Sequence, residues 1–310
     1  MHRIDGPGAT VDKKFTEGDP VGGISATVVT AAWMNDVQEE LVSVLAAAGI
    51  TPVKGTQDQL LKAIRTISTG VVGASANAKM AVNVASTSAT FTADEVLVKS
   101  ALGNTAWVLP GFNRTINLAA TGAGGMDTGT APVNGYVALY AIYNPTNGAS
   151  ALLSVNATSI AAPPVYGGAN MPAGYTASAL VSVWGTNASG QLQVGYQADR
   201  EVHTLPFAIL ASSVATLTVT SISLASAVPL NAKKGFFKTT MSQGSGGNVG
   251  FTIQPHATQI IHTLTLSTTI ALSQSTIVET LPIMTPQLFY FSTLTSNAGN
   301  YNMFLHGYIF

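Results

Sequence analysis

Two segments near the amino terminus have the spacing of apolar residues that is typical of amphipathic helices. In the first, between Thr30 and Gly49, apolar side chains recur every three or four residues and would line one face of a helix. Thr30 can accept a hydrogen bond from the first turn, and Gly49 can adopt the left-handed conformation that ends a helix. The predicted apolar face consists of Trp33, Val37, Leu41, Val44 and Leu45.

The second helical segment is shorter. Thr56 and Gln59 have the spacing of a capping box, and a helix that starts there would carry an apolar stripe until Gly70. Two short helices cannot enclose a large core, so we expect their stripes to pack on each other, on a partner protein or on symmetry-related copies. The second stripe consists of Leu60, Leu61, Ile64 and Ile67.

The character of the chain changes after residue 70. Residues 71–90 are mostly Ala, Ser, Asn, Val and Gly, and Lys79 is the one charged side chain among them. This composition predicts a linker or an extended stalk.

Short runs of β-forming residues, separated by turn residues, fill the rest of the chain. Asn134-Gly135 and Asn147-Gly148 flank one of these runs and are pairs that favour tight hairpin turns. Runs of this length and spacing predict an all-β fold of the sandwich or jelly-roll type. The predicted strands lie at 137–143, 179–184, 191–196, 217–224, 251–254, 260–266, 288–294 and 301–310.

The sequence therefore predicts a mainly β protein in which a short α-helical segment precedes two β-sandwich or jelly-roll-like domains. We place the junction between the two β domains near His203 to Pro206. The expected parts are residues 1–70 with two helices, 71–90 as the linker, 91–203 as the middle β domain and 204–310 as the carboxyl-terminal β domain.

Charged residues are scarce and unevenly distributed. The 310 residues include 13 Lys and Arg and 14 Asp and Glu, or 9%, where about 25% is usual. A net charge of -1 without large basic clusters argues against nucleic-acid binding and against attachment to anionic membranes. Nine charged side chains remain after Ala101, so a monomer would expose a broad uncharged surface. Burial of part of that surface between copies would relieve the exposure.

Membrane insertion and disulfide chemistry are not expected. The uncharged stretch 205–230 contains alternating polar and apolar residues and is bracketed by Pro206 and Pro229, which favours a half-buried strand over a transmembrane helix. The absence of cysteine excludes disulfides, thiolate nucleophiles and Cys-ligated zinc. The first residues lack the apolar core of a signal peptide, so we expect synthesis and folding in a cytoplasm.

Four short motifs follow one another through the helical segment. They are Phe15-Thr-Glu-Gly-Asp-Pro20, residues 26–41, Ala48-Gly-Ile-Thr-Pro52 and Gln59-Leu-Leu-Lys-Ala-Ile64. In this order they resemble the amino-terminal segment of tail-fibre proteins from tailed bacteriophages of Gram-negative bacteria. The block 91–203 is similar to a domain of the same class of tail proteins, through residues 122–132, 140–145 and 166–180. Residues 227–233 and 307–310 carry a looser likeness to compact phage fibre domains.

The resemblance implies a homotrimeric virion component, made in the host cytoplasm and located in the tail fibre or tail tip. Its amino-terminal segment would dock to phage tail or baseplate proteins, its middle domain would act as spacer and trimerisation body, and its carboxyl-terminal domain would meet the bacterial surface. The residues expected to serve virion attachment or oligomerisation are Trp33, Val37, Leu41, Leu45, Leu60 and Ile64.

The sequence offers little for catalysis. It lacks the Gly-x-Ser-x-Gly and His-Glu-x-x-His motifs, and His256 and His262 have no nearby acids to complete a metal site. Asp199 and Glu201 would share one strand face about 7 Å apart, which suits an acid/base pair, but a solvated domain junction is the reading we favour. We predict no catalytic residue, no metal and no cofactor.

One basic cluster lies in the β region. Lys233, Lys234 and Lys238 would either contact anionic lipopolysaccharide or protect a solvated strand edge from aggregation. The second explanation accounts for them as well as the first does.

Receptor recognition without charge would depend on aromatic rings, amides and hydroxyls. Two loops of the carboxyl-terminal domain, 242–248 and 296–302, offer such groups, and Tyr301 is the ring we select; its alternative role is packing at a trimer interface. Trp107 and Trp184 fall in strand-like runs and are expected in the core. The predicted receptor-binding residues are Gln243, Ser245, Asn248, Asn300, Tyr301 and Asn302.

The expected function is multivalent, non-covalent adsorption of a phage to its bacterial host, through a polysaccharide, a pilus or an outer-membrane protein. Two alternatives stay open: a fibre with glycan hydrolase or esterase activity, and a structural baseplate or tail-tip component without receptor contact.

Overall fold

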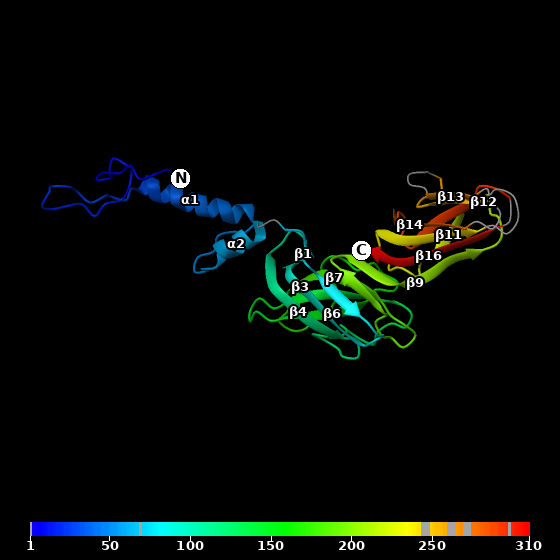
Figure 1. Ribbon diagram of the computed structural model, residues 1–310. Coiled ribbons are helices and arrows are strands. Elements are labelled where there is room, and N and C mark those ends of the chain that lie inside the picture. Colours follow the sequence, from blue (N-terminus) through cyan, green and yellow to red (C-terminus); the bar gives the residue numbers. More distant parts are fainter. Residues whose placement is uncertain (1, 68–69, 243–248, 259–263, 269–273, 297–298) are drawn as a thin grey trace. The chain divides into compact units, whose positions relative to one another are not determined.

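The computed structural model describes residues 2–67, 70–242, 249–258, 264–268, 274–296 and 299–310 (Figure 1). The chain divides into two compact units. We call Met1–Thr69 with Gly103–Ala106 the helical unit, and Gly70–Leu102 with Trp107–Phe310 the β unit.

The first helix of the helical unit, α1 (Ala31–Ala47), begins and ends where its sequence predicts. The Thr30 hydroxyl accepts a hydrogen bond from the Trp33 N–H at 3.3 Å, so Thr30 is the N-cap. Gly49 follows the last turn with a φ of 69°, a left-handed conformation that glycine adopts without steric cost. The predicted caps at both ends of this helix are confirmed.

The second helix, α2 (Gln59–Ile67), starts later than a capping box at Thr56 requires. The hydrogen bond of its first turn runs from the Lys62 N–H to the Asp58 carbonyl at 3.0 Å, so the helix starts after Asp58. The Gln59 amide donates to the carbonyls of Val53 and Thr56 at 2.8 and 3.0 Å. The predicted capping box is therefore wrong, since Gln59 instead fastens the preceding loop to the start of the helix.

Within the described residues of the β unit, twelve strands form one large antiparallel sheet. Ten of them follow the order β14-β11-β16-β9-β8-β2-β3-β7-β5-β6, and β1 and β4 both pair with β3. The strands are β1 (Ser75–Ala76), β2 (Lys79–Val82), β3 (Ser88–Lys99), β4 (Ala106–Asn117), β5 (Tyr136–Tyr143), β6 (Ser150–Asn156), β7 (Ala177–Gly185), β8 (Gly195–Ala198), β9 (Glu201–Ser212), β11 (Lys234–Ser242), β14 (Gln274–Pro282) and β16 (Asn300–Ile309).

Four further described strands form a smaller sheet that covers one face of the larger one. Phe237 on β11 packs against Phe289 on β15, with ring centroids 4.8 Å apart. The two sheets thus share an apolar layer, as in a β-sandwich, and the prediction of a mainly β, sandwich-like fold is confirmed. The strands of the smaller sheet are β10 (Thr220–Ser223), β15 (Leu288–Thr293), β12 (Val249–Gln254) and β13 (Leu264–Thr268), in that order.

Strands β5 and β7 lie at the centre of the core. Every residue of β7 is buried, and so is every residue of β5 except Tyr143. Strands that are covered on both faces need apolar residues at consecutive positions, which explains why these two runs lack a period of two. Trp184 is buried here and donates from its indole to the Gln193 carbonyl at 2.9 Å, in the core as predicted.

The segment that the sequence suggests as a linker is part of the sheet. Residues 71–90 include β1, β2 and the beginning of β3, and along this segment Ala78, Met80 and Val82 are buried. Lys79 and Ala81 between them are exposed. The linker prediction is wrong because small residues at alternating positions suffice for a strand when a neighbouring sheet supplies the bulk of the core.

The junction expected near His203 to Pro206 lies inside β9. This strand pairs with β8 on one side and with β16 on the other. The two predicted β domains consequently share one sheet and belong to one compact unit.

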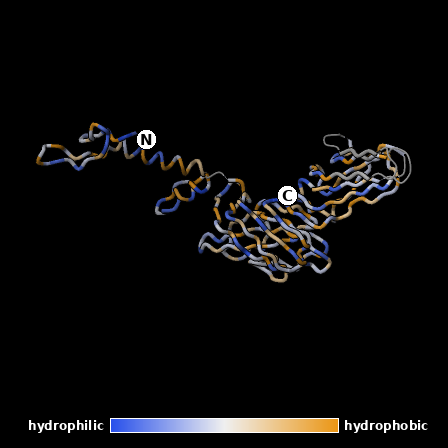
Figure 2. Tube along the Cα trace, in the orientation of Figure 1, coloured by the Kyte–Doolittle hydropathy of each residue, from blue (hydrophilic) through white to orange (hydrophobic). Residues whose placement is uncertain are grey.

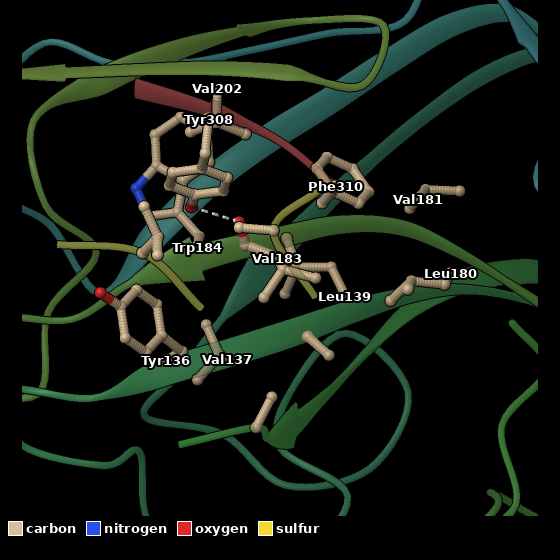
Figure 3. Packing of buried hydrophobic residues seen from close by; sticks show 14 of the residues in the cluster. Tyr136, Val137, Leu139, Leu180, Val181, Val183, Trp184, Val202, Tyr308 and Phe310 are labelled. Carbon is tan, nitrogen blue, oxygen red and sulfur yellow. Dashed lines mark hydrogen bonds between the residues drawn. The ribbon is translucent and has the colours of Figure 1, made fainter. Parts of the chain in front are cut away.

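The end of β16 is inserted among the central strands. Tyr308 is buried beside Trp184 and Val202, and its hydroxyl donates to the Val183 carbonyl at 2.7 Å (Figure 3). Burial raises the pKa of Tyr308 well above its ordinary value, so the hydroxyl keeps its proton.

Arg200 binds Phe310, the residue that follows β16. Its guanidinium donates to the Phe310 carbonyl oxygen at 3.0 Å and lies 4.6 Å from the centroid of the Phe310 ring. The carbonyls of Gly73 and Leu180 accept longer hydrogen bonds from it, both of 3.4 Å. Arg200 thereby joins the beginning, the middle and the end of the β unit.

We predict that Tyr308→Phe lowers the free energy of unfolding by about 1 kcal/mol, because the Val183 carbonyl loses its buried donor while the packing of the ring is kept. Chemical denaturation of the purified chain measures the change. The matched control is Tyr196→Phe, which removes an equal hydroxyl from an exposed side chain and should change stability by less than about 0.5 kcal/mol. Equal effects of the two substitutions would contradict the assigned role of Tyr308.

Candidate functional site

The predicted receptor-binding residues are only partly within the described chain. Gln243, Ser245 and Asn248 lie outside the described residues. Tyr301 on β16 has an exposed fraction of 0%, so its ring belongs to the core of the β unit and is not presented to a ligand in this structure. Asn300 is exposed, and its amide lies 3.4 Å from the Ser242 hydroxyl.

Asn302 is half-buried on the same strand. Asn300, Tyr301 and Asn302 are therefore consecutive residues of β16. Because side chains alternate along a strand, the ring of Tyr301 faces inward while the two asparagine side chains face outward.

The carboxylate pair considered for hydrolysis does not share a strand. Asp199 lies in the tight turn between β8 and β9 with a φ of 51°, and its carboxylate accepts from the Ala78 N–H at 3.0 Å. Glu201 begins β9 and lies 3.7 Å from His203. The expectation of one strand face is wrong because the turn comes between the two residues.

No cluster of three or more metal-ligating side chains occurs in the part of the chain that the structure describes. The His256 ring nitrogen accepts from the Thr258 N–H at 3.2 Å, and His262 lies outside the described residues.

The three lysines do not protect a sheet edge. Lys233, Lys234 and Lys238 are exposed, but β11 pairs with β14 on one side and β16 on the other. The strand-edge explanation of this cluster is therefore wrong.

The predicted attachment residues divide into packed and exposed groups. Leu45 is buried, and Trp33 and Val37 are half-buried. Leu41 and Ile64 have exposed fractions of 47% and 52%. The exposed apolar residues of the two helices, which we call the helical apolar stripe, are Met34, Leu41, Leu60, Leu61, Ile64 and Ile67. Figure 2 shows hydrophobic positions along the helical unit.

Trp33 holds the amino-terminal chain against α1. Its indole donates to the His2 carbonyl at 3.1 Å, and its ring meets Phe15 edge-on at 5.1 Å between centroids. The His2 ring lies 2.6 Å from the Asp36 carboxylate, and this hydrogen bond raises the pKa of His2. Trp33 therefore serves the fold of the helical unit, a role that its position on the predicted apolar face did not reveal.

The sequence did not reveal a row of stacked rings on the surface of the β unit. Tyr196 on β8 stacks on His203 on β9 with centroids 4.6 Å apart and an interplanar angle of 12°. His203 stacks in turn on Phe236 on β11, with centroids 4.6 Å apart and an interplanar angle of 8°. The centroid of the His306 ring on β16 lies 6.0 Å from that of Phe236. We call these four side chains the ring ladder.

The ring ladder crosses a strand that contributes no side chain at the crossing point. β16 lies between β9 and β11, and its Gly307 is the cross-strand partner of His203. A Cβ at Gly307 would lie 2.8 Å from Phe236 Cδ2 and 2.4 Å from the Val202 carbonyl oxygen. Phe236 can therefore reach His203 only because residue 307 is glycine.

The same sheet face is hollowed around Tyr196 and on towards β4. Three adjoining hollows of about 290, 450 and 540 Å³ follow one another across β9, β8, β2, β3 and β4. The first two share Tyr196, and the last two share Lys79 and Thr92. We call this continuous depression the sheet groove.

The comparison with known proteins gives one partial relative. Over 73 residues, or 22% of the chain, the sequence is 42% identical to "Uncharacterized protein StfP" of Escherichia coli (strain K12). The match covers 35% of StfP, so the chain spans about a third of the length of that relative. No protein-family model matches the chain. Among the described residues, neither helix has the length and apolarity needed to cross a membrane.

We predict that Gly307→Ala lowers the free energy of unfolding by about 1–3 kcal/mol, because the new methyl group would meet the Val202 carbonyl and Phe236. Chemical denaturation measures this loss, and the ring-current shifts of the His203 protons in NMR spectra report the state of the ladder. Gly167→Ala is the control, since a Cβ there meets nothing within 4 Å. An unchanged His203 spectrum in Gly307→Ala would refute the crossing described above.

Proposed function

We propose that this chain is a bacteriophage tail-fibre protein that adheres, as a homotrimer and without enzymatic activity, to the surface of a bacterial host. The observation that carries the proposal is the partial relationship to StfP, whose name hints at a side tail fibre. The order of motifs in the helical unit and the mainly β architecture support the same assignment.

The helical unit is proposed to bind other virion proteins or copies of itself. The helical apolar stripe supports this role, because α1 and α2 pack on each other and still leave large apolar side chains in water. Burial of such residues against a tail or baseplate protein, or around a threefold axis, would remove apolar surface from water at about 25 cal/mol per Å².

The β unit is proposed to carry the host contact, with a polysaccharide, a pilus or an outer-membrane protein as the receptor. Three copies in one fibre, and several fibres on one particle, would combine weak contacts through their high effective concentration. In this proposal the protein belongs to the virion.

The adhesion proposal predicts that the purified full chain sediments with a mass three times 31.8 kDa and binds intact cells of at least one strain in a panel of Escherichia coli surface types. The same preparation should compete with the phage particle that carries the chain and slow its adsorption. Analytical ultracentrifugation and an adsorption assay measure the two properties. A trimer that binds no strain and does not compete would favour a purely structural component, and a monomer would remove the basis for multivalent adhesion.

The attachment proposal predicts a selective loss on combining Leu60→Gln with Ile64→Gln. Both side chains are exposed in this chain, so the isolated protein should keep its circular dichroism spectrum and its stability within about 0.5 kcal/mol per site. Trimer formation or incorporation into particles should fall, as measured by ultracentrifugation and by immunoblotting of purified virions. The control is Arg65→Gln, an exposed charged residue of the same helix, and equal behaviour of the two variants would contradict the proposal.

A further inference from the structure

The ring ladder ends at Tyr196 with one ring face uncovered. His203 covers one side of the Tyr196 ring at 4.6 Å. The cross-strand neighbour on the other side is Ala81 on β2, whose methyl group is too small to cover an aromatic ring. Tyr196 accordingly has an exposed fraction of 53%, and the uncovered side borders the middle hollow of the sheet groove.

A ring held in this way is a preorganised stacking platform. The stack with His203 fixes its orientation before any ligand arrives, so little conformational freedom would be lost on binding. The electron-rich face of an aromatic ring attracts polarised C–H groups, which line one face of a pyranose sugar.

The rest of the sheet groove supplies hydrogen-bonding groups. Lys79 is directly opposite Thr92 in the strand register, and both line the middle and last hollows. Asn113 and the backbone of Gly111 line the last hollow. These donors and acceptors could bind the hydroxyl groups of a ligand that lies along the groove.

The charges of the groove are nearly balanced. Among the residues that line the groove, the charged side chains are Lys79 and Asp94. The Asp94 carboxylate accepts a hydrogen bond from the Asn77 amide at 2.6 Å. A groove with one cation and one anion provides no field for a polyanion, so it does not suit a nucleic acid or a highly charged polymer.

The dimensions and edges of the groove favour a flexible polar chain over a protein. It crosses five neighbouring strands from β9 to β4, and four spacings of about 4.8 Å give about 19 Å, which is several sugar units long. Strands β8, β2 and β3 are paired on both sides, so along these three strands no backbone edge is free for an added β-strand. The large apolar side chains that the groove exposes are Tyr196 and Leu205, fewer than the cluster of anchors that a protein interface requires.

We propose that the sheet groove binds an oligosaccharide segment of a neutral or weakly charged bacterial surface polysaccharide, with one sugar stacked on the free face of Tyr196. This inference rests on the proposed adhesive function and names its receptor class. It also moves a host contact from the carboxyl-terminal loops to β2, β3, β4 and β8.

Two substitutions test the platform in opposite ways. Ala81→Trp would extend the ring ladder and cover the free face of Tyr196, and a large aromatic residue at an exposed strand position suits the β conformation. Tyr196→Ala would remove the platform. Tyr196→Phe is the matched control, since it keeps the ring and removes only the hydroxyl.

The probe is an array of immobilised O-antigen and capsular polysaccharides from Escherichia coli, read with the fluorescently labelled full chain. We expect binding to at least one neutral or weakly charged polysaccharide, a loss of about tenfold or more in Ala81→Trp and Tyr196→Ala, and a change within about threefold in Tyr196→Phe. Each variant must first show the circular dichroism spectrum and sedimentation of the parent chain. If Ala81→Trp fails this check, Thr90→Trp, which places a bulky ring in the same hollow from β3, takes its place.

Binding of the same labelled proteins to intact cells separates this inference from the adhesion proposal. If the parent chain binds cells but no polysaccharide, or if Ala81→Trp or Thr90→Trp does not weaken polysaccharide binding, the proposed glycan site is wrong and the adhesion proposal is unaffected. A chain that binds neither cells nor polysaccharide overturns both.

Discussion

The β unit depends on the pairing of β16 with β9, because this pairing carries the end of the chain into the core of the middle strands. Tyr308 fills space between Trp184 and Val202 and hydrogen-bonds to Val183 on β7. Arg200, in the turn that precedes β9, closes over Phe310. Residues far apart in sequence are thereby joined, so β11, β14 and β16 share one sheet with the strands before them, and the β unit is one compact unit instead of two domains on a tether.

The parts of the fold that local sequence determines were predictable. α1 was found with its caps because a helix is specified by apolar spacing and end residues that lie within one stretch of chain. The mainly β class followed from turn residues and β-forming runs. β2 was not predicted, because Met80 and Val82 are buried only when β3 and β8 lie beside them. The pattern of residues within 71–90 does not indicate this pairing.

The candidate site was not predictable for the same reason. The ring ladder takes its members from β8, β9, β11 and β16, and the stack exists only because Gly307 leaves room for Phe236 to cross β16. Strand alternation also reversed one prediction, since Tyr301 faces the core while Asn300 is exposed. A single ring in a sequence has no orientation until the register and the bulges of its strand are known.

Several of the few charged side chains of the β unit are also engaged in hydrogen bonds or ring contacts within the fold. Asp199 caps the Ala78 N–H, Asp127 accepts from the Tyr166 hydroxyl, and Arg114 donates to the Ser150 carbonyl, while Arg200 is committed to Phe310. With nine charged side chains after Ala101, most of the β unit has little charge with which to steer a partner from a distance. Recognition there depends on shape, stacking and hydrogen bonds, which act at contact and gain strength when several copies bind together.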